Sequence, residues 1–351
     1  MAFANVLLDW YHEYGRDLPW RQTRDPYAIW LSEIILQQTQ VKQGWDYWER
    51  FMRRWPTVES LAAATEDEVL REWQGLGYYS RARNLHFAAK QIVALGHFPN
   101  TLNDIKQLKG VGDYTAAAIA SFAFDIPAAV VDGNVFRVLA RHFGIDTAIN
   151  TTEGKKVFAT LAQELLPTPH HPSPNTHHPS SITHHPSPNT STYNQAIMDF
   201  GAIQCTPASP NCMFCPLVET CVAFRTNKVN ELPVKLKTLK ITERHLTYIY
   251  IRCNGQTAIH RRGPGDIWQG LWEPWLVDEE SLKQCTKNYQ LRLVKQGVKH
   301  VLTHRVLYAD FYLLEIGEKP TLPSDYIWID ESELDNYALP RLIDKQLFSF
   351  R

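Results

Sequence analysis

The chain has 351 residues, 44% of them hydrophobic, and this length and composition favour two domains with sizeable cores. Its 36 basic and 37 acidic residues nearly balance, so the net charge neither requires nor excludes a polyanionic partner. The N-terminal stretch has no signal-peptide pattern, and no window reaches the roughly 18 apolar residues of a transmembrane helix. We therefore expect an intracellular, cytoplasmic protein that does not bind membranes.

Helical periodicity dominates the first half of the chain. From Phe3 to about Leu166, apolar residues recur at spacings of three and four, with short Gly and Pro breaks between the runs. This pattern predicts an all-α region. Its predicted helices include Tyr27–Phe51, Glu66–Trp73, Arg81–Leu95 and Thr115–Phe124.

Glu33 is the first candidate functional residue. On a helix it shares a face with Ile29, Trp30 and Leu36, which are bulky and apolar. A half-buried carboxyl has a raised pKa and suits a general acid near neutrality. The competing interpretation is a surface glutamate at the edge of the apolar stripe.

The segment LKGVGDYT, residues 108–115, indicates a tight turn between two helices. Its glycines let the backbone turn and expose N–H groups at a helix N-terminus, which suits a phosphate. This is the helix-hairpin-helix pattern for holding the DNA backbone without reading its sequence. An ordinary helix–helix turn would look similar.

Asp132 follows Gly112 by twenty residues and occupies an N-cap position. The predicted helix after it carries Val135, Val138 and Leu139 on its apolar face. Simple capping competes here with a functional role. The apolar run before Asp132 and the candidate DNA clamp upstream favour the functional role.

Residues 170–190 contain a seven-residue unit, HHPSPNT, three times with small changes. Its prolines and lack of apolar residues exclude a coiled-coil seam, so we predict a disordered insert over residues 168–191. The six histidines of the repeat could bind a metal weakly. A tandem duplication in a surface loop explains the composition better.

Four of the six cysteines lie within seventeen residues, spaced C-x6-C-x2-C-x5-C: Cys205, Cys212, Cys215 and Cys221. In a reducing compartment such a group is a metal or cluster site rather than a disulfide frame. Four thiolates can hold zinc or a [4Fe–4S] cluster, and the presence of a single C-x2-C favours the cluster. Cys253 and Cys285 are expected to be ordinary buried or half-buried thiols.

Strand patterns appear after a basic linker. Two alternating runs flank Asn254-Gly255, a strong hairpin signal, and a helix-like segment covers Ser281–Tyr289. Alternation returns in HVLTHRVLYADFYLLEI, residues 300–316. We therefore predict a multi-domain chain with an all-α domain at 1–228, a linker at 229–243 and an α+β domain at 244–351.

Together, the hairpin, Asp132 and the cysteine loop resemble the signature of the helix-hairpin-helix DNA glycosylases of the endonuclease III class, which carry a [4Fe–4S] cluster. Within this class the chain is similar to the MutY-type adenine DNA glycosylases. The likeness is carried by LPWR (18–21), LSEIILQQTQ (31–40), GLGYYSRARNLH (75–86), VDGNV (131–135) and YNQAIMDFGA (193–202). It implies a [4Fe–4S] cofactor and a monomer that acts on duplex DNA with adenine opposite 8-oxoguanine or guanine, at the nucleoid if the source is bacterial.

The resemblance also implies catalytic roles. Glu33 would protonate adenine N7, and Asp132 would stabilise the oxocarbenium-like sugar, either electrostatically or by a transient covalent bond. Asn134 and Tyr114 would help to position the site. Related lyases have a lysine where this chain has Tyr114, so base release without efficient strand cleavage is expected.

Further DNA contacts follow from the same likeness. The residues expected at the flipped adenine are Trp20, Arg21 and Gln195. Those expected at the DNA backbone are the hairpin residues Gly110, Val111 and Gly112. Those expected at the disrupted stack and the opposing base are Gln38, Thr39, Leu76, Tyr78, Thr303 and His304.

The C-terminal domain resembles the MutT-like module that recognises 8-oxoguanine. It lacks the R-E-x-x-E-E-x-G metal-binding box, so hydrolysis of nucleotide pyrophosphates is not expected. Leu302-Thr303-His304 stands where the family usually has Phe-Ser-His. We expect 8-oxoguanine recognition to survive with altered discrimination.

Two alternative functions stay open at this point. A mismatch-specific thymine glycosylase would share the hairpin, the aspartate and the cluster, but the MutT-like extension and Glu33 argue against it. A non-catalytic iron–sulfur protein that binds DNA lesions would keep every property after Glu33→Gln or Asp132→Asn.

Overall fold

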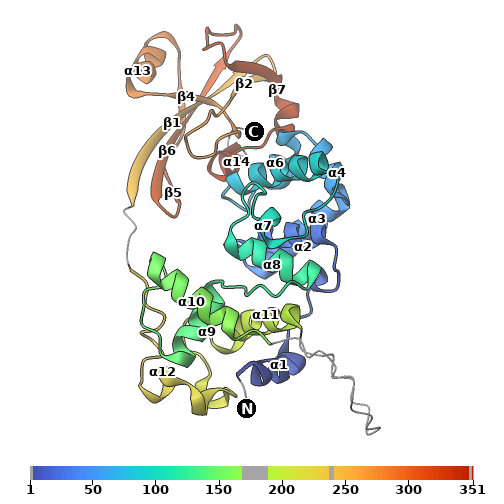
Figure 1. Ribbon diagram of the computed structural model, residues 1–351. Helices are drawn as coiled ribbons and strands as arrows, with labels where there is room; N and C mark the ends of the chain where they lie inside the picture. The colour runs from blue at the N-terminus through green and yellow to red at the C-terminus, as the bar shows by residue number, and fades with distance from the viewer. Residues whose placement is uncertain (1–2, 168–188, 237–240, 348–349, 351) are drawn as a thin grey trace, which may run out of the picture. The chain divides into compact units, whose positions relative to one another are not determined.

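The computed structural model describes residues 3–167, 189–236, 241–347 and 350. The chain divides into two compact units, Met1–Gln40 with Gln91–Lys237 and Val41–Lys90 with Thr238–Arg351. Each unit therefore joins segments that are distant in sequence, as the colours of Figure 1 show.

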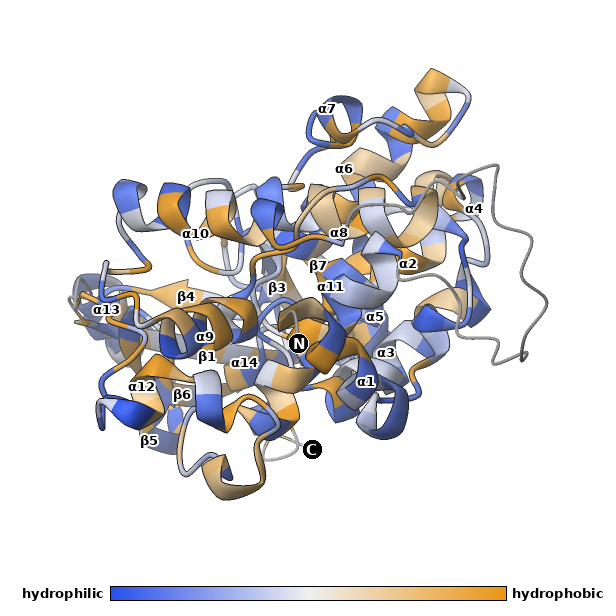
Figure 2. Ribbon diagram, turned by 60° about the horizontal axis from the view of Figure 1, so that its bottom comes forward, coloured by the Kyte–Doolittle hydropathy of each residue, from blue (hydrophilic) through white to orange (hydrophobic). Residues whose placement is uncertain are grey.

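The first unit is helical, as predicted. Its core packs α1 and α9 against α11, around Leu7, Leu139 and Phe200. In α9 hydrophobic and hydrophilic residues alternate in short groups, which Figure 2 shows in colour. The elements are α1 (Phe3–Tyr14), η1 (Pro19–Arg21), α2 (Pro26–Leu36), α7 (Leu102–Ile105), α8 (Asp113–Phe124), α9 (Gly133–Phe143), α10 (Thr152–Glu164), α11 (Thr190–Asp199), η2 (Phe200–Gln204), η3 (Cys212–Phe214), η4 (Val218–Thr220) and α12 (Val222–Arg225). Across the described parts of the chain, no helix is long and apolar enough to span a bilayer.

The second unit combines helices with a mixed sheet, whose strand order is β3-β2-β1-β6-β5. Strands β1 and β6 pair in parallel, while β4 pairs with β1 and β7 with β2 in antiparallel fashion. The elements are α3 (Val41–Arg54), α4 (Val58–Ala63), α5 (Glu66–Glu72), α6 (Ser80–Leu95, whose last residues belong to the first unit), β1 (Thr242–Cys253), β2 (Gln256–Arg261), β3 (Trp272–Glu273), β4 (Trp275–Val277), α13 (Glu279–Asn288), β5 (Arg292–Val301), β6 (Arg305–Ile316), β7 (Tyr326–Asp330), η5 (Glu331–Asn336) and α14 (Arg341–Leu347).

The predicted hairpin at Asn254-Gly255 is confirmed. Cys253 pairs with Gln256, so the loop has two residues, and their φ angles are 50° and 80°. Two successive left-handed residues form the turn that matches strand twist. The predicted helix near Ser281 is confirmed as α13.

Two predicted boundaries are wrong. The helix predicted over Tyr27–Phe51 is two helices, because α2 ends at Leu36 and α3 begins at Val41. Between them Gln38 has a φ of 56°, a left-handed conformation that stops an α-helix. The insert predicted over 168–191 overlaps the start of α11, which the Asn189 side chain caps. The rest of the His/Pro repeat lies outside the described residues.

Candidate active site

Glu33 lies inside the first unit, where α2 packs against α8. Its side chain is 6% exposed, and the Tyr114 hydroxyl donates a hydrogen bond of 2.7 Å to its Oε2. Burial raises the pKa of Glu33 to about 7; the charge of Asp132 adds to the rise, while Tyr114 and Arg21 oppose it. The alternative of a surface glutamate is therefore wrong, and the carboxyl can give up a proton near neutral pH.

Asp132 is the N-cap of α9, as predicted. Its Oδ1 accepts hydrogen bonds of 2.8 Å from the backbone N–H groups of Asn134 and Val135, and its Oδ2 accepts one of 2.9 Å from Asn134 Nδ2. Burial raises the pKa of Asp132, and these hydrogen bonds oppose the rise. Capping thus fixes the orientation of a carboxyl whose charge acts on Glu33.

The first turn of α9 is joined to the start of the cysteine loop through Arg137. This guanidinium donates to Asn134 Oδ1 at 2.9 Å, to the Gly201 carbonyl at 2.6 Å and to the Cys205 carbonyl at 2.6 Å. The backbone at Gly201 also packs closely against the first turn of α9, since a Cβ at this position would lie 2.7 Å from Cβ of Asn134. One further turn along α9, Arg141 donates to Thr206 O at 2.7 Å.

The four cysteines predicted as ligands line one small cavity, together with Arg141. Arg141 Nη1 donates to Cys205 Sγ at 3.4 Å. Burial raises the pKa of the Cys215 thiol to about 11. Within the described ranges, no three His, Cys, Asp or Glu side chains converge to hold one metal ion. Cys253 and Cys285 are buried free thiols, as expected.

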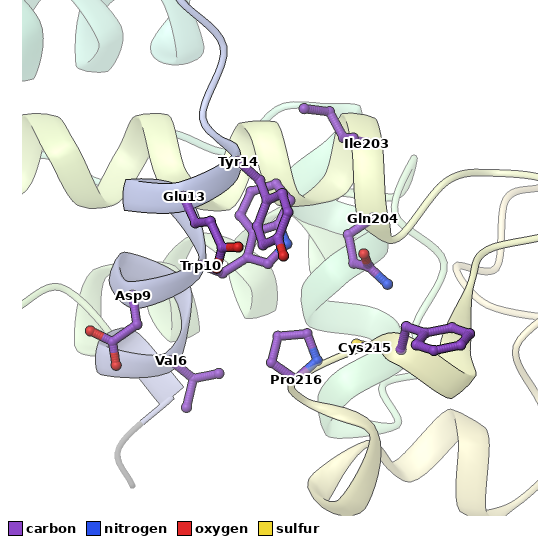
Figure 3. Close-up of a pocket in the computed structure, with 10 residues that line it drawn as sticks. Val6, Asp9, Trp10, Glu13, Tyr14, Ile203, Gln204, Cys215 and Pro216 are labelled. Carbon is purple, nitrogen blue, oxygen red and sulfur yellow. The ribbon is translucent and has the colours of Figure 1, made fainter.

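Cys215 also lines a second, open pocket of about 650 Å³. Figure 3 shows Trp10 and Tyr14 of α1 on one wall and Gln204 of η2 with Cys215 on another. Solvent can therefore reach the wall of the cysteine cavity from this side.

Two residues predicted to contact adenine, Arg21 and Gln195, belong to one hydrogen-bond network. Both Nη atoms of Arg21 donate to the carboxylate of Asp199, at 2.7 and 2.8 Å. Tyr11 donates to Gln195 Oε1 at 2.9 Å and accepts from Arg21 at 3.4 Å. Trp20 is buried on the same turn as Arg21.

The hairpin predicted to hold DNA is present in the first unit. Gly110 has a φ of 80° and Val111 is buried, and Gly112 is the N-cap of α8. No side chain caps this helix, so its first N–H groups are available to an anion. Gln38 and Thr39 lie in the turn after α2.

Four other predicted contacts meet around a pocket of about 540 Å³ in the second unit. The Tyr78 hydroxyl contacts the Thr303 hydroxyl, and His304 lies beside it in the β5–β6 loop. Tyr78 has a φ of 45°, which is uncommon for a bulky side chain. Leu76 is 8% exposed and lines the same pocket.

Sequence reasoning missed three residues that position this site. Arg137 and Asp199 make the contacts described above. Asn194 accepts a hydrogen bond from Val130 N at 3.2 Å and donates one to Ala128 O at 2.9 Å. These two bonds hold the segment before Asp132. A signal existed for Asp199, which lies one helical turn after Gln195 in the same motif.

Comparison with known proteins gives matches along nearly the whole chain. Residues 31–167 match the HhH-GPD superfamily of base excision DNA repair proteins, and residues 247–348 match the NUDIX domain. The adenine DNA glycosylase of Buchnera aphidicola subsp. Schizaphis graminum is 32% identical, over 100% of this chain and 99% of the relative. That of Mus musculus is 42% identical, over 64% of this chain and 42% of the relative.

Solved structures match the helical part. A thermostable thymine-DNA glycosylase superimposes with a TM-score of 0.55 at 29% identity, over 64% of this chain and 95% of its own. Endonuclease III in a non-covalent DNA complex superimposes with a TM-score of 0.51 at 21% identity, over 64% of this chain and 94% of its own. The second likeness shows the fold alone.

The hydrogen bond from Tyr114 can be tested without any substrate. Tyr114→Phe removes a donor that stabilises ionised Glu33, so the pKa of Glu33 should rise above about 7. Carbon-13 NMR titration of the Glu33 carboxyl measures this. The matched control is Tyr193→Phe, since the Tyr193 hydroxyl is buried with no hydrogen-bond partner in the described structure. A lower Glu33 pKa in Tyr114→Phe would contradict the assignment.

Proposed function

Since the chain belongs to the family of adenine DNA glycosylases, we propose that it releases adenine opposite 8-oxoguanine, and more slowly adenine opposite guanine, without cutting the strand. The observation that carries this proposal is the buried carboxyl of Glu33, which has a pKa of about 7 and lies in reach of Tyr114. Such a group is half protonated at neutral pH and can serve first as acid and then as base.

In the proposed reaction, Glu33 gives its proton to N7 of a flipped adenine. The C1′–N9 bond then breaks, its electron pair leaves with the base, and positive charge develops on the sugar. Glu33, now ionised, takes a proton from the water that adds to C1′, which restores its protonated form. The products are adenine and an abasic site.

Asp132 would stabilise the cationic sugar. Three hydrogen bonds fix the direction of its carboxylate before the substrate arrives, and preorganised charge is the most effective kind of electrostatic catalysis. Asn134 supplies two of these bonds and is itself held by Arg137. Arg21 and Gln195, linked through Tyr11, would contact the adenine.

A hydrolytic outcome is supported by Tyr114. Burial and the nearby carboxyls raise the pKa of its hydroxyl well above 10, so it stays protonated and serves as a donor. It offers no amine for a Schiff base with the sugar.

The uncapped start of α8 supports binding to the DNA backbone at Gly110, Val111 and Gly112. With duplex DNA as the substrate, the enzyme would work at the nucleoid in a bacterial cell. We propose that it acts as a monomer.

The pocket between Tyr78 and Thr303 supports recognition of the opposing base. 8-Oxoguanine differs from guanine in an N7–H donor and an O8 acceptor, and a hydroxyl can pair with either one. Thr303 and His304 offer polar groups there, and Leu76 offers an apolar wall. The missing aromatic residue at Leu302 would lower stacking on the base.

We also propose that the four cysteines hold a [4Fe–4S] cluster. They line one cavity, and four thiolates are the ligand set of such a cluster. Arg141 and Arg137 near Cys205 would offset the negative charge of such a group. The cluster would stabilise the cysteine loop, which follows α11 and η2.

Removing either carboxylate should stop base release. Glu33→Gln and Asp132→Asn should each slow single-turnover release of adenine opposite 8-oxoguanine by about 1000-fold, because one loses the acid and the other the stabilising charge. DNA affinity should change little. Glu13→Gln, at an exposed position, is the control.

The same assay distinguishes the alternative functions. Strand breaks should appear only after alkali treatment. Breaks without alkali, or release of thymine from a G·T mismatch, would contradict the proposal, and unaltered rates in both variants would favour a protein that binds lesions without catalysis.

The Thr303 hydroxyl should set the preference for the oxidised base. Thr303→Val keeps the side-chain shape and should lower the ratio of adenine release opposite 8-oxoguanine to that opposite guanine by about tenfold, on the order of one hydrogen bond to the base. Thr303→Ser should keep the ratio. An unchanged ratio in Thr303→Val would argue against this pocket as the reading site.

The metal content decides between cluster and zinc. Purified protein should be brown and contain about four iron atoms per chain. Elemental analysis and the visible absorption spectrum measure this. Cys212→Ala should lose most of the iron, whereas Cys253→Ala should keep it. Colourless protein with one zinc per chain would refute the cluster.

A further inference from the structure

Asp199 is fully buried at the end of α11 and binds two guanidiniums at once. Arg16 donates to it from its backbone N at 2.9 Å, from Nε at 2.9 Å and from Nη2 at 2.5 Å. Arg21 donates from both Nη atoms, at 2.7 and 2.8 Å. One carboxylate thus receives five hydrogen bonds from two residues of the loop between α1 and α2.

These bonds keep Asp199 charged. Burial acts to raise its pKa, but the hydrogen bonds and charges of Arg21 and Arg16 outweigh burial and lower it. Asp199, Arg16 and Arg21 therefore form a charge cluster with one negative and two positive charges at neutral pH. Losing the negative charge would leave two cations uncompensated beside the site.

The charge cluster includes one of the proposed adenine contacts, Arg21. Because Asp199 occupies both Nη atoms of Arg21, the guanidinium has one fixed orientation. The Tyr11 hydroxyl links Arg21 by hydrogen bonds to Gln195, which lies one turn before Asp199 on α11. Asp199 therefore holds Arg21 directly and is linked to Gln195 through Arg21 and Tyr11.

The charge cluster also acts on Glu33, through Arg21. The titratable and charged groups that face Glu33 are Tyr114 from α8, Asp132 from the cap of α9 and Arg21 from η1. Arg21 is the positively charged group among these three residues. Its charge favours ionised Glu33, and Asp199 weakens that effect because it pairs with the same guanidinium.

We propose that Asp199 is a positioning residue for base release: its carboxylate fixes Arg21, a proposed adenine contact, together with Arg16, and offsets their charge beside the proton that Glu33 donates. This inference rests on the proposed role of Glu33 as the acid. Asp199 itself does not contact the substrate.

The test is the pH profile of single-turnover adenine release from a duplex with adenine opposite 8-oxoguanine. In Asp199→Asn the uncompensated cations favour ionised Glu33, so the alkaline limb should move to lower pH by about one unit. At a pH on that limb, this equals a further rate loss of about tenfold. In Arg16→Gln the carboxylate pairs with Arg21 alone, so the limb should move to higher pH.

A structural role alone predicts a different result. It would lower the rate by the same factor at every pH and leave the limb in place in both variants, which would overturn the proposal. Thermal melting checks that each variant is folded. If Asp199→Asn does not fold, Arg16→Gln decides by itself, because its side chain is partly exposed and an unmoved limb again refutes the inference.

Glu33→Gln in the same assay separates the two proposals. If this variant keeps base release and the alkaline limb, the role of Glu33 is wrong and the limb reports another group. If it loses release while Asp199→Asn leaves the limb unmoved, the acid assignment stands and the Asp199 inference fails.

Discussion

The burial of the Glu33 carboxyl is the constraint on which the rest of the first unit depends. An ionised carboxylate without partners in such a place would cost several kcal/mol, on the order of what most domains have in total stability. The protein meets this cost by raising the pKa of Glu33 to about 7 and by aiming the Tyr114 hydroxyl at it. A residue that is expensive to bury and is still buried here needs a chemical reason, and the proposed proton transfer would supply one.

Helix α9 connects the charge at Asp132 with the cysteine loop. Its cap orients the carboxyl at one end, while Arg137 and Arg141 bind carbonyls of the loop from one face of the helix. Gly201 lets the π-helical turn η2 approach the first turn of α9, where a Cβ would collide with Asn134. A cluster held by the loop would therefore support the catalytic geometry without taking part in the reaction.

Local patterns predicted much of this arrangement. An aspartate before an apolar helix predicts a cap, a glutamate on an apolar face predicts burial, and Asn-Gly between alternating runs predicts a hairpin; all three are confirmed. The patterns failed where distant contacts decide. Residues 37–40 contain no Gly or Pro to mark the turn at Gln38, so the sequence hides the break after α2. Arg16 and Asp199 are 183 residues apart, and no periodicity links them.

The position of Tyr114 explains why this scaffold would favour hydrolysis. An amine at the start of α8, beside two carboxyls, would either be charged or attack the sugar. Either outcome would change the protonation of Glu33. A phenol there has its pKa raised well above 10 by burial and by Glu33, so it keeps its proton near neutral pH. It can then hold the carboxyl by one hydrogen bond without competing for the sugar. Tyr114 thus offers no amine nucleophile, and its hydrogen bond lowers the pKa of Glu33 against the larger effect of burial.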